Sequence, residues 1–419
     1  YETKTKRKRL GICIDDMGIY YDCKSESRLQ ELLGTKMSKE EEERGKRLVE
    51  RWREYRLTKY NGPIEDECPT ENFVLVVDQV KGDLSIEHGG LGDSALEKMI
   101  LDAMEEWPAH TILIRQHPEA KRKRKGGMLG NKLESRGGRI KVFESEGSPV
   151  RQLERCDAIY TATSQLGFEG ILWEKTVYTY GWPFYAGLGL TIDRQEKCLT
   201  RQRSKVTKEA LALRALSDYC RYKHPETKKI CRVEKVMKWV DLQIKSTRLL
   251  PDKIVGVGFT PWKRRQLEGF MQRSRGQSLR YRVRSVGRTK DGEVVAVWGN
   301  QCPIGLDRKK SNHIRVEDGF IRSFGLGSEL TNAQSWIADR IGIYYDGSRE
   351  SGIERLLLQD RKLTNEQRSR AARIVESMKM LKISKYNEDG RPWQPRGIAA
   401  SKRVVLVIGQ VESDASIKY

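Results

Sequence analysis

Short apolar runs alternate with amphipathic stretches through the middle of the chain, and this alternation predicts its elements. Phe73–Val77 is continuously apolar, which is typical of a strand buried on both faces. The next stretch places apolar residues at helical spacing from Leu96 to Trp107, with Asp93 or Ser94 as the expected N-cap. Further strands are expected at 111–114, 140–143, 158–160 and 176–178, and helices near 150–155 and 167–173. Strands and helices in this order predict a parallel, doubly wound α/β sheet.

The chain also repeats itself in three blocks that keep the same order. Ile14–Asp22 reappears as Ile337–Asp346 with one inserted residue, Leu57–Asn61 as Ile383–Asn387, and Val74–Ile86 as Val405–Ile417. A period of roughly 330 residues is far longer than that of solenoid repeats, so it indicates a duplicated domain. Residues 1 to about 250 read as the later part of one copy and 252–419 as the earlier part of the next. We therefore expect two tandem modules, each only partly present.

Polar residues follow three of the predicted strands, at the sheet edge where ligands bind in such folds. Gln79 and Asp83 follow the first strand, His117 the second, and Thr163 and Ser164 the fourth. Ser164 begins a predicted helix, whose free amides and dipole favour a phosphate. His117 by itself is better explained as a structural residue, but next to Asp83 and Ser164 it favours a phosphate site. The edge is therefore a candidate nucleotide site.

Composition narrows the class of partner without naming it. The chain has 79 Lys and Arg against 58 Asp and Glu, a net charge of +21, which attracts nucleic acid, an anionic membrane surface or a nucleotide sugar alike. The run Lys121–Lys125 is explained equally by a solvated loop and by contact with an anionic acceptor or lipid. No P-loop occurs, and Gly256-Val257-Gly258 lacks the third glycine of a dinucleotide fingerprint.

The cysteines and the hydropathy pattern indicate a cytoplasmic protein. The eight cysteines show no CxxC pair and no Cys/His ligand spacing, so we expect neither zinc nor a disulfide framework. No apolar run is long enough to span a membrane, and the basic N-terminus lacks the apolar core of a signal peptide. Any membrane contact is therefore expected to be peripheral.

Together these motifs resemble those of the KpsC-type capsule polysaccharide proteins, which are tandem retaining β-Kdo transferases (Kdo is 3-deoxy-manno-octulosonic acid). The matching residues are Val76–Gln79 with Gly82-Asp83 and Ser85-Ile86, Gln116–Glu119, Thr163–Glu169, Gly181–Gly187 leading to Leu190-Thr191, Gly258-Phe259 near Trp262-Lys263, Val316–Ser323, and Gly342–Asp346. The resemblance covers nearly the whole chain. It implies GT-B-like modules, each with two Rossmann-type halves, CMP-Kdo as donor substrate, and no metal or other cofactor.

The resemblance also assigns the segments. Residues 1–72 would end the N-terminal half of module one, and 73–250 would form its nucleotide-sugar-binding half with a helical tail. Residues 251–403 would form the N-terminal, acceptor-side half of module two, and 404–419 would begin its nucleotide-sugar-binding half. The family's acidic pair before glycine is Glu317-Asp318-Gly319 in the second copy, whereas its His-Pro and Ser/Thr pairs lie in the first.

Chemical roles follow from these assignments. We expect Asp83, repeated as Asp414, to be the nucleophile, because retention at a ketosidic carbon needs a covalent intermediate or a front-face attack. Glu317 or Asp318 is the expected acid/base residue of the second module. The expected substrate-binding residues are Gln79, His117, Thr163, Ser164, Tyr185, Gln410 and Ser416. Purely structural roles stay open for some of these residues: helix capping by Asp83 and Asp414, an ordinary β-turn at Glu317–Gly319, and an aromatic packing loop around Tyr185.

The resemblance also predicts the protein's setting. The expected acceptor is a poly-Kdo linker on a lyso-phosphatidylglycerol-type lipid at the cytoplasmic, inner face of the inner membrane. The expected partners are that anionic membrane surface and other capsule biosynthesis and export proteins, with no specific nucleic acid. Two alternatives remain: a basic non-catalytic protein that binds nucleic acid or membrane surfaces, and an inactive fragment of the transferase.

Overall fold

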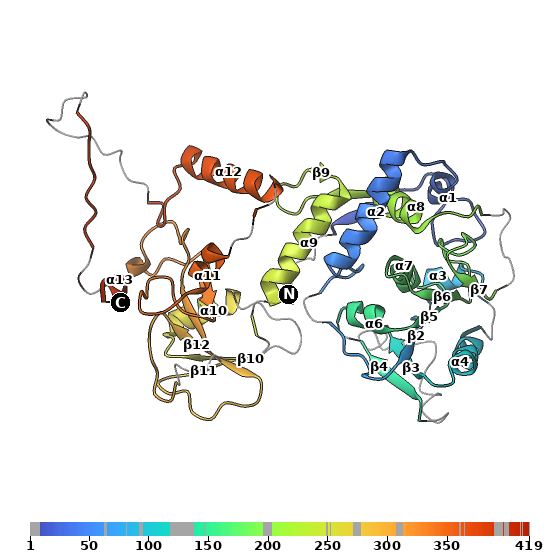
Figure 1. Cartoon of the computed structure of the whole chain (residues 1–419), viewed down its shortest axis with the longest axis horizontal. Helices are drawn as coiled ribbons and strands as arrows, with labels where there is room; N and C mark the ends of the chain where they lie inside the picture. The colour runs from blue at the N-terminus through green and yellow to red at the C-terminus, as the bar shows by residue number, and fades with distance from the viewer. Residues whose placement is uncertain are drawn as a thin grey trace. The chain divides into compact units, whose positions relative to one another are not determined.

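The computed structural model describes residues 9–62, 65–80, 82–91, 95–117, 138–145, 147–195, 203–248, 250–251, 253–270, 278–306, 313–359, 362–363, 365–388, 397, 402–410, 412 and 414–418. The chain divides into two compact units, which meet in sequence at Arg248 and Leu249 (Figure 1). The run Lys121–Lys125, Pro118 and the two proposed N-caps Asp93 and Ser94 lie outside the described residues.

The first unit is built on a six-stranded, wholly parallel sheet in the order β4-β3-β2-β5-β6-β7. Its strands are β2 (Phe73–Val77), β3 (Thr111–Gln116), β4 (Ile140–Glu144), β5 (Ala158–Thr161), β6 (Thr176–Thr179) and β7 (Ile192–Asp193). A smaller antiparallel sheet joins β1 (Gly11–Cys13), β8 (Cys220–Lys223) and β9 (Ile230–Cys231) in the order β1-β8-β9. The predicted parallel α/β fold is confirmed.

Helices cover both faces of this sheet because β2 is apolar on both sides. Phe73, Leu75 and Val77 belong to one apolar cluster, whereas Val74 and Val76 belong to the cluster packed under α4. The helices are α1 (Arg28–Leu33), α2 (Lys39–Glu54), α3 (Leu84–Glu87), α4 (Ala95–Glu106), α6 (Val150–Arg155), α7 (Gln165–Leu172), α8 (Lys208–Leu213) and α9 (Val233–Arg248). Since α2 packs on α7, α8 and α9, the division predicted at residue 72 falls inside one compact unit (Figure 1).

The second unit contains a five-stranded sheet in the order β11-β10-β12-β13-β14. Its strands are β10 (Lys253–Val257), β11 (Ser278–Arg282), β12 (Glu293–Trp298), β13 (His313–Asp318) and β14 (Trp336–Asp339), and β14 alone among these runs antiparallel to its neighbour. Its helices are α10 (Pro261–Phe270), α11 (Gly352–Leu358), α12 (Asn365–Met380) and α13 (Ala415–Lys418). Both units are therefore mixed α/β structures with parallel strands.

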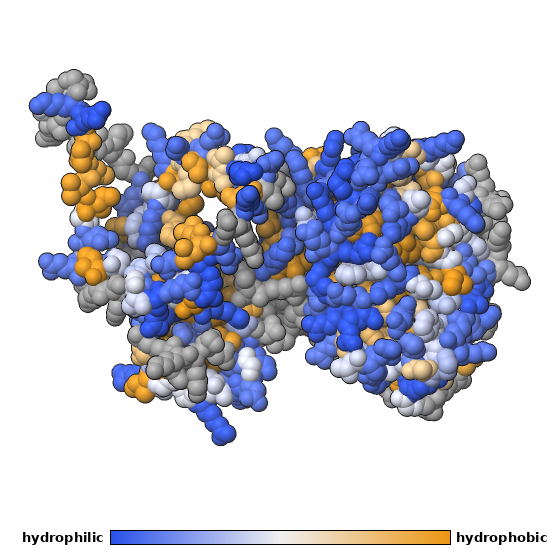
Figure 2. Space-filling view, in the orientation of Figure 1, coloured by the Kyte–Doolittle hydropathy of each residue, from blue (hydrophilic) through white to orange (hydrophobic). Residues whose placement is uncertain are grey.

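The repeated apolar segment has different surroundings in the two units. In the first unit Phe73–Val77 is the buried strand β2, whereas residues 405–408, the counterpart of Val74–Val77, lie outside the described sheets and are 79–87% exposed. In Figure 2 this segment forms the orange column at the left of the view. A strand of this composition is buried only when strands and helices flank both sides, as β3, β5 and α4 do around β2.

Candidate functional site

A cluster of three polar side chains lies at the carboxyl edge of the first sheet. The Gln79 amide nitrogen donates to Thr163 Oγ1 at 3.1 Å and to Ser85 Oγ at 3.3 Å, while the Thr163 backbone N–H donates to Gln79 Oε1 at 2.8 Å. The two hydroxyls of Ser85 and Thr163 are 3.2 Å apart. The structure therefore joins the segments after β2 and β5, and it brings together the predicted residues Gln79 and Thr163.

Asp83 lies beside this cluster as the N-cap of α3. Its Oδ1 accepts a hydrogen bond from the Ser85 backbone N–H at 3.0 Å, and the side chain is half-buried. Gly82, immediately before it, has φ +76°, a backbone conformation that glycine adopts without steric cost. The capping geometry considered from sequence is thus present, and it holds the carboxylate next to Ser85.

Two more predicted residues lie around the same sheet edge. Ser164 caps α7 by accepting from the Leu166 N–H at 3.3 Å, so its amide end faces the edge where Thr163 lies. His117 is half-buried directly after β3, and β3, β2 and β5 are adjacent strands. The residues that follow these three strands therefore share one rim, as predicted.

Tyr185 has a different place from the one expected of a substrate-binding residue. It is fully buried, and its hydroxyl donates to the Ser164 carbonyl. It also packs against Gly167, where an added Cβ would lie 2.3 Å from the tyrosine hydroxyl. Contrary to the prediction, Tyr185 presents no exposed surface to a ligand; it supports the start of α7, because its ring fills the space that Gly167 leaves open.

The repeat reproduces this local geometry in the second copy. The Ser416 N–H donates to Asp414 Oδ1 at 2.9 Å, and the Gln410 amide nitrogen lies 3.4 Å from Ser416 Oγ, as in the cluster around Ser85. Asp414, Gln410 and Ser416 are exposed here. The described residues of this copy contain the loop but not the flanking strands that surround Asp83.

The tyrosine blocks are also duplicated, and they align without an inserted residue. Asp15 Oδ1 accepts from the N–H groups two and three residues ahead, at 3.0 and 3.1 Å, and Asp339 Oδ1 does the same at 2.8 and 3.2 Å. An added Cβ at Gly18 or Gly342 would meet a backbone oxygen at 2.3 or 2.4 Å. Asp15 and Asp339 therefore occupy equivalent positions. The alignment expected from sequence, with one inserted residue in the second block, is wrong.

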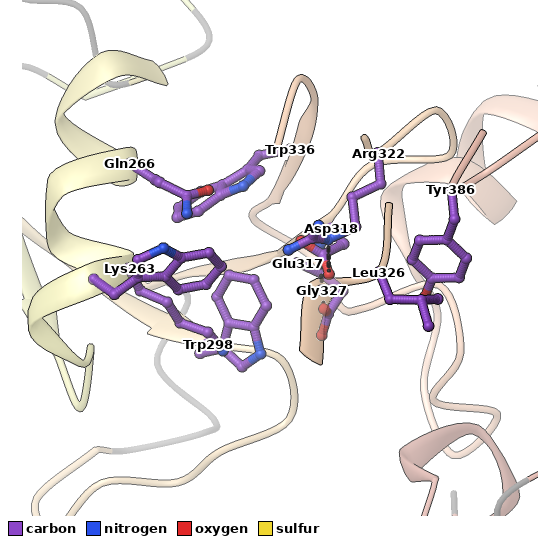
Figure 3. Close-up of a pocket in the computed structure, with 11 residues that line it drawn as sticks. Lys263, Gln266, Trp298, Glu317, Asp318, Arg322, Leu326, Gly327, Trp336 and Tyr386 are labelled. Atoms are coloured by element: carbon purple, nitrogen blue, oxygen red, sulfur yellow. Dashed lines mark hydrogen bonds and ion pairs between the residues drawn. The ribbon is translucent and has the colours of Figure 1, made fainter. Parts of the chain in front are cut away.

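The second unit contains a pocket of about 420 Å³ around the predicted acidic pair (Figure 3). Helix α10 contributes one wall, the ends of β12, β13 and β14 form the floor, and the segment 322–327 and Tyr386 close the far side. The lining residues are Trp262, Lys263, Gln266, Trp298, Glu317, Asp318, Arg322, Leu326, Gly327, Trp336 and Tyr386. Acidic, basic and aromatic side chains thus meet in one cavity.

The two acidic residues of this pocket have different partners. Glu317 Oε2 accepts from the Tyr345 hydroxyl at 3.1 Å, and burial raises the pKa of the Glu317 carboxyl above its usual value. Asp318 Oδ2 lies 2.8 Å from Nε of the buried Arg322. Since Asp318 is neutralised by a guanidinium and Glu317 is not, Glu317 is the better proton acceptor.

Lys263 supplies a positive charge opposite these carboxylates. Its Nζ lies 3.3 Å from the centre of the Trp298 ring, and Trp298 packs edge-on against Trp336 at 5.3 Å between ring centres. Burial lowers the pKa of the Lys263 ammonium, while Glu317 acts in the opposite direction. An indole-rich wall that carries a partly desolvated cation suits an anionic sugar, whose ring stacks on indole faces and whose carboxylate pairs with the ammonium.

Three buried polar atoms around this pocket lack a hydrogen-bond partner among the described residues: Gln266 Nε2, Trp336 Nε1 and Asp318 Oδ1. Buried polar atoms of this kind are nearly always paired. All three atoms belong to side chains that line the pocket. Sequence reasoning missed Gln266, Trp298 and Trp336, since their positions follow no spacing and only the fold brings them together.

Gly319 is required by close packing at the end of β13. An added Cβ there would lie 2.1 Å from Ser335 Oγ and 2.9 Å from the Ser335 carbonyl carbon. We expect Gly319→Ala to lower the free energy of unfolding by about 1–3 kcal/mol, because the backbone next to Asp318 must shift. Denaturant unfolding of the full chain measures this. The control is Gly269→Ala in α10, where nothing lies within 4 Å; a loss of stability equal to that of Gly319→Ala would contradict the argument.

Two findings bear on cofactors and membranes. Within the described ranges, no group of three His, Cys, Asp or Glu residues is arranged to hold a metal ion. In the same part of the chain, the helices are all too short or too polar to cross a bilayer.

The fold and its two polar clusters define a mixed α/β protein with polar side chains gathered at the carboxyl ends of parallel strands. The family model for "Capsule polysaccharide biosynthesis protein" matches residues 45–223. The capsule polysaccharide modification protein LipA of Neisseria meningitidis is 31% identical over 428 residues, covering 97% of this chain and 60% of LipA. The lipopolysaccharide-processing protein LpsZ of Rhizobium meliloti is 30% identical over 199 residues, 44% of each protein.

Among solved structures, the β-Kdo 2,4 transferase KpsC of Thermosulfurimonas dismutans is 33% identical with a TM-score of 0.51, covering 55% of this chain and 73% of that one. The chain belongs to the KpsC-type family of capsule polysaccharide biosynthesis proteins, as its motifs predicted. It spans 60% of the length of LipA.

Proposed function

We propose that this chain is part of a retaining glycosyltransferase that moves β-Kdo from CMP-Kdo to a glycolipid acceptor in capsule biosynthesis. Membership of the family and the similarity to a β-Kdo 2,4 transferase support this reaction class. The observation that carries the proposal is the convergence of Gln79, Ser85 and Thr163 beside Asp83 at one sheet edge. The proposed acceptor is a poly-Kdo linker on lyso-phosphatidylglycerol.

In the first unit, the donor phosphate would bind near the start of α7. The dipole of α7 favours a phosphate at this end of the helix, and His117 lies on the same rim to donate to it. Asp83 would attack the anomeric carbon, so that a carbon–oxygen bond to the carboxylate forms as the bond to CMP breaks. Gln79 and Thr163 would hold the Asp83–Ser85 turn in place through their shared hydrogen bonds.

In the second unit, Glu317 would remove the proton of the acceptor hydroxyl that attacks a Kdo–enzyme intermediate of its own module, carried by Asp414. Its raised pKa and its place in the pocket suit it to general base catalysis. Lys263 would neutralise the carboxylate of the sugar bound there. The equivalent donor loop of this module would carry Asp414 with Gln410 and Ser416.

A setting at the cytoplasmic face of the inner membrane fits a glycolipid acceptor. The net charge of +21 favours the anionic lipid surface, and other capsule biosynthesis and export proteins would receive the product there. The alternative of a non-catalytic nucleic-acid-binding protein rests on the same charge. Salt-dependent DNA binding without turnover of CMP-Kdo would favour that alternative.

The decisive experiment is intact-protein mass spectrometry after incubation of the full chain with CMP-Kdo. We expect a transient gain of one Kdo residue, mapped by peptide analysis to Asp83, and its loss in Asp83→Ala. Asp414→Ala is the matched control, since it removes the repeated aspartate of an exposed loop and should leave the Asp83 adduct unchanged. A chain that gains Kdo while its Asp83 peptide stays unmodified, or a double variant Asp83→Ala with Asp414→Ala that still transfers Kdo at the wild-type rate, would refute the assignment.

A further inference from the structure

Two cysteines that are 207 residues apart in sequence meet in the small antiparallel sheet of the first unit. Their sulfur atoms are 3.2 Å apart, and Cys13 of β1 is directly opposite Cys220 of β8 in the strand register. Residues opposite each other in an antiparallel pair have Cα atoms about 4.5–5.5 Å apart, inside the range that a disulfide spans. A small approach of the two sulfurs would therefore close a covalent bond without displacing the strands.

The two thiols are chemically unequal. Cys13 is exposed and Cys220 is half-buried. The contact with Cys220 lowers the pKa of the Cys13 thiol, whereas the same contact raises the pKa of Cys220. A thiolate attacks a disulfide and a thiol does not, so Cys13 is suited to attack first and Cys220 to resolve the product.

The contact between Cys13 and Cys220 lies at one end of the pairing between β1 and β8. This ladder has only three residue pairs. Two residues further along, the carboxylate of Asp15 accepts from the Tyr219 hydroxyl at 2.9 Å and anchors the first tyrosine block. Ile337 of β14 occupies the position of Cys13 in the second copy, so the thiol pair is particular to the first unit.

We propose that Cys13 and Cys220 form a reversible thiol–disulfide exchange site that reacts with low-molecular-weight disulfides and clamps β1 to β8. The Cys13 thiolate attacks the small disulfide, forming a mixed disulfide and releasing one small thiol. Cys220 then loses its proton and attacks Cys13 Sγ, which forms the protein disulfide and releases the second small thiol. One small disulfide is thereby reduced to two thiols as two protein thiols are oxidised.

The test is a titration of the full chain with oxidised glutathione, followed by peptide mapping without reductant. We expect a cross-linked peptide pair containing Cys13 and Cys220, about 2 Da lighter than the reduced peptides together and reversed by dithiothreitol. In the reduced chain, Cys13 should be alkylated at least about fivefold faster than Cys220. Closing the ladder should raise the unfolding midpoint by on the order of 5 °C.

Variants separate this site from general thiol oxidation. Cys220→Ser should stop the reaction at a mixed disulfide on Cys13, and Cys13→Ser should leave Cys220 reduced. Cys231→Ser, in the adjacent strand β9, is the matched control and should still form the cross-link. Mapping on the unaltered chain does not depend on these variants folding. A cross-link from Cys13 to Cys231, or a stable mixed disulfide in the unaltered chain, would overturn the proposal.

Discussion

Replacing Glu317 with glutamine is expected to reduce the rate of sugar transfer at the second-unit pocket by about 10²- to 10⁴-fold, the usual contribution of a positioned general base. Glutamine keeps the size of the side chain and can still contact Tyr345, but it cannot accept the proton of an acceptor hydroxyl. Transfer is measured with CMP-Kdo and a soluble Kdo-terminated acceptor. Glu329→Gln, an exposed carboxylate on a nearby turn, is the control. A rate within twofold of wild type for Glu317→Gln would show that another group acts as the base.

The pH profile gives an independent test of the same residue. A base must be deprotonated, so the rate should fall as the pH drops through the raised pKa of Glu317. The Tyr345 hydroxyl donates to this carboxylate and thereby favours its charged form. Tyr345→Phe should therefore move the acidic limb of the profile to higher pH. An unchanged limb in Tyr345→Phe would argue against titration of Glu317 in the profile.

Replacing Arg115 with methionine is expected to destabilise the first unit by about 3–5 kcal/mol, the cost of leaving a buried charge without its counter-ion. Arg115 is buried, forms an ion pair with the buried Asp66, and also donates to Gln152 Oε1 at 2.9 Å. Without the guanidinium, the Asp66 carboxylate keeps the neutral Ser145 hydroxyl and Gly147 N–H as donors. The effect matters for the site because Arg115 lies two residues before His117.

Calorimetry of the full chain should show the unfolding midpoint of the first unit lowered by on the order of 10 °C. Lys141→Ala, in the neighbouring strand β4, is the matched control, since it removes a cation from an exposed ion pair with Glu71, where solvent screens the charges. The double variant Arg115→Met with Asp66→Leu should recover part of the lost stability, because the carboxylate that lost its guanidinium is then removed as well. A single variant Arg115→Met as stable as Lys141→Ala would show that the pair contributes little.

Part of the first unit follows from its sequence alone. The continuous apolar run at 73–77 predicts a strand buried on both faces, and the structure confirms it with separate apolar clusters on each side. The strand and helix bounds predicted from 95 to 179 are confirmed to within a few residues. Gln79 and Thr163 were both predicted as substrate-binding residues, and they lie in contact because parallel neighbouring strands end at the same edge.

The sequence was informative about local turns and misleading about side-chain exposure. The repeat at Asp83 and Asp414 correctly indicated one shared turn, since the same N–H of the following serine reaches each carboxylate. Tyr185 was predicted to bind substrate, but its side chain is buried. The sequence could not show this, because a tyrosine in an aromatic loop can point inward or outward. Its direction depends on the space at Gly167, which lies 18 residues earlier in the chain.

The sequence by itself determined the strand and helix pattern and the polar ends of the strands, because each of these depends on residues close together in the chain. It also determined the duplication, because the two copies can be compared letter by letter. Only the tertiary structure decided that Trp262, Trp298 and Trp336 surround Glu317, and that Cys13 meets Cys220. These contacts join segments from different strands and helices, and no local spacing encodes them. The physical reason is that a pocket or a thiol pair forms only where particular helices and strands pack together. Which of them pack together depends on how the whole unit buries its apolar side chains.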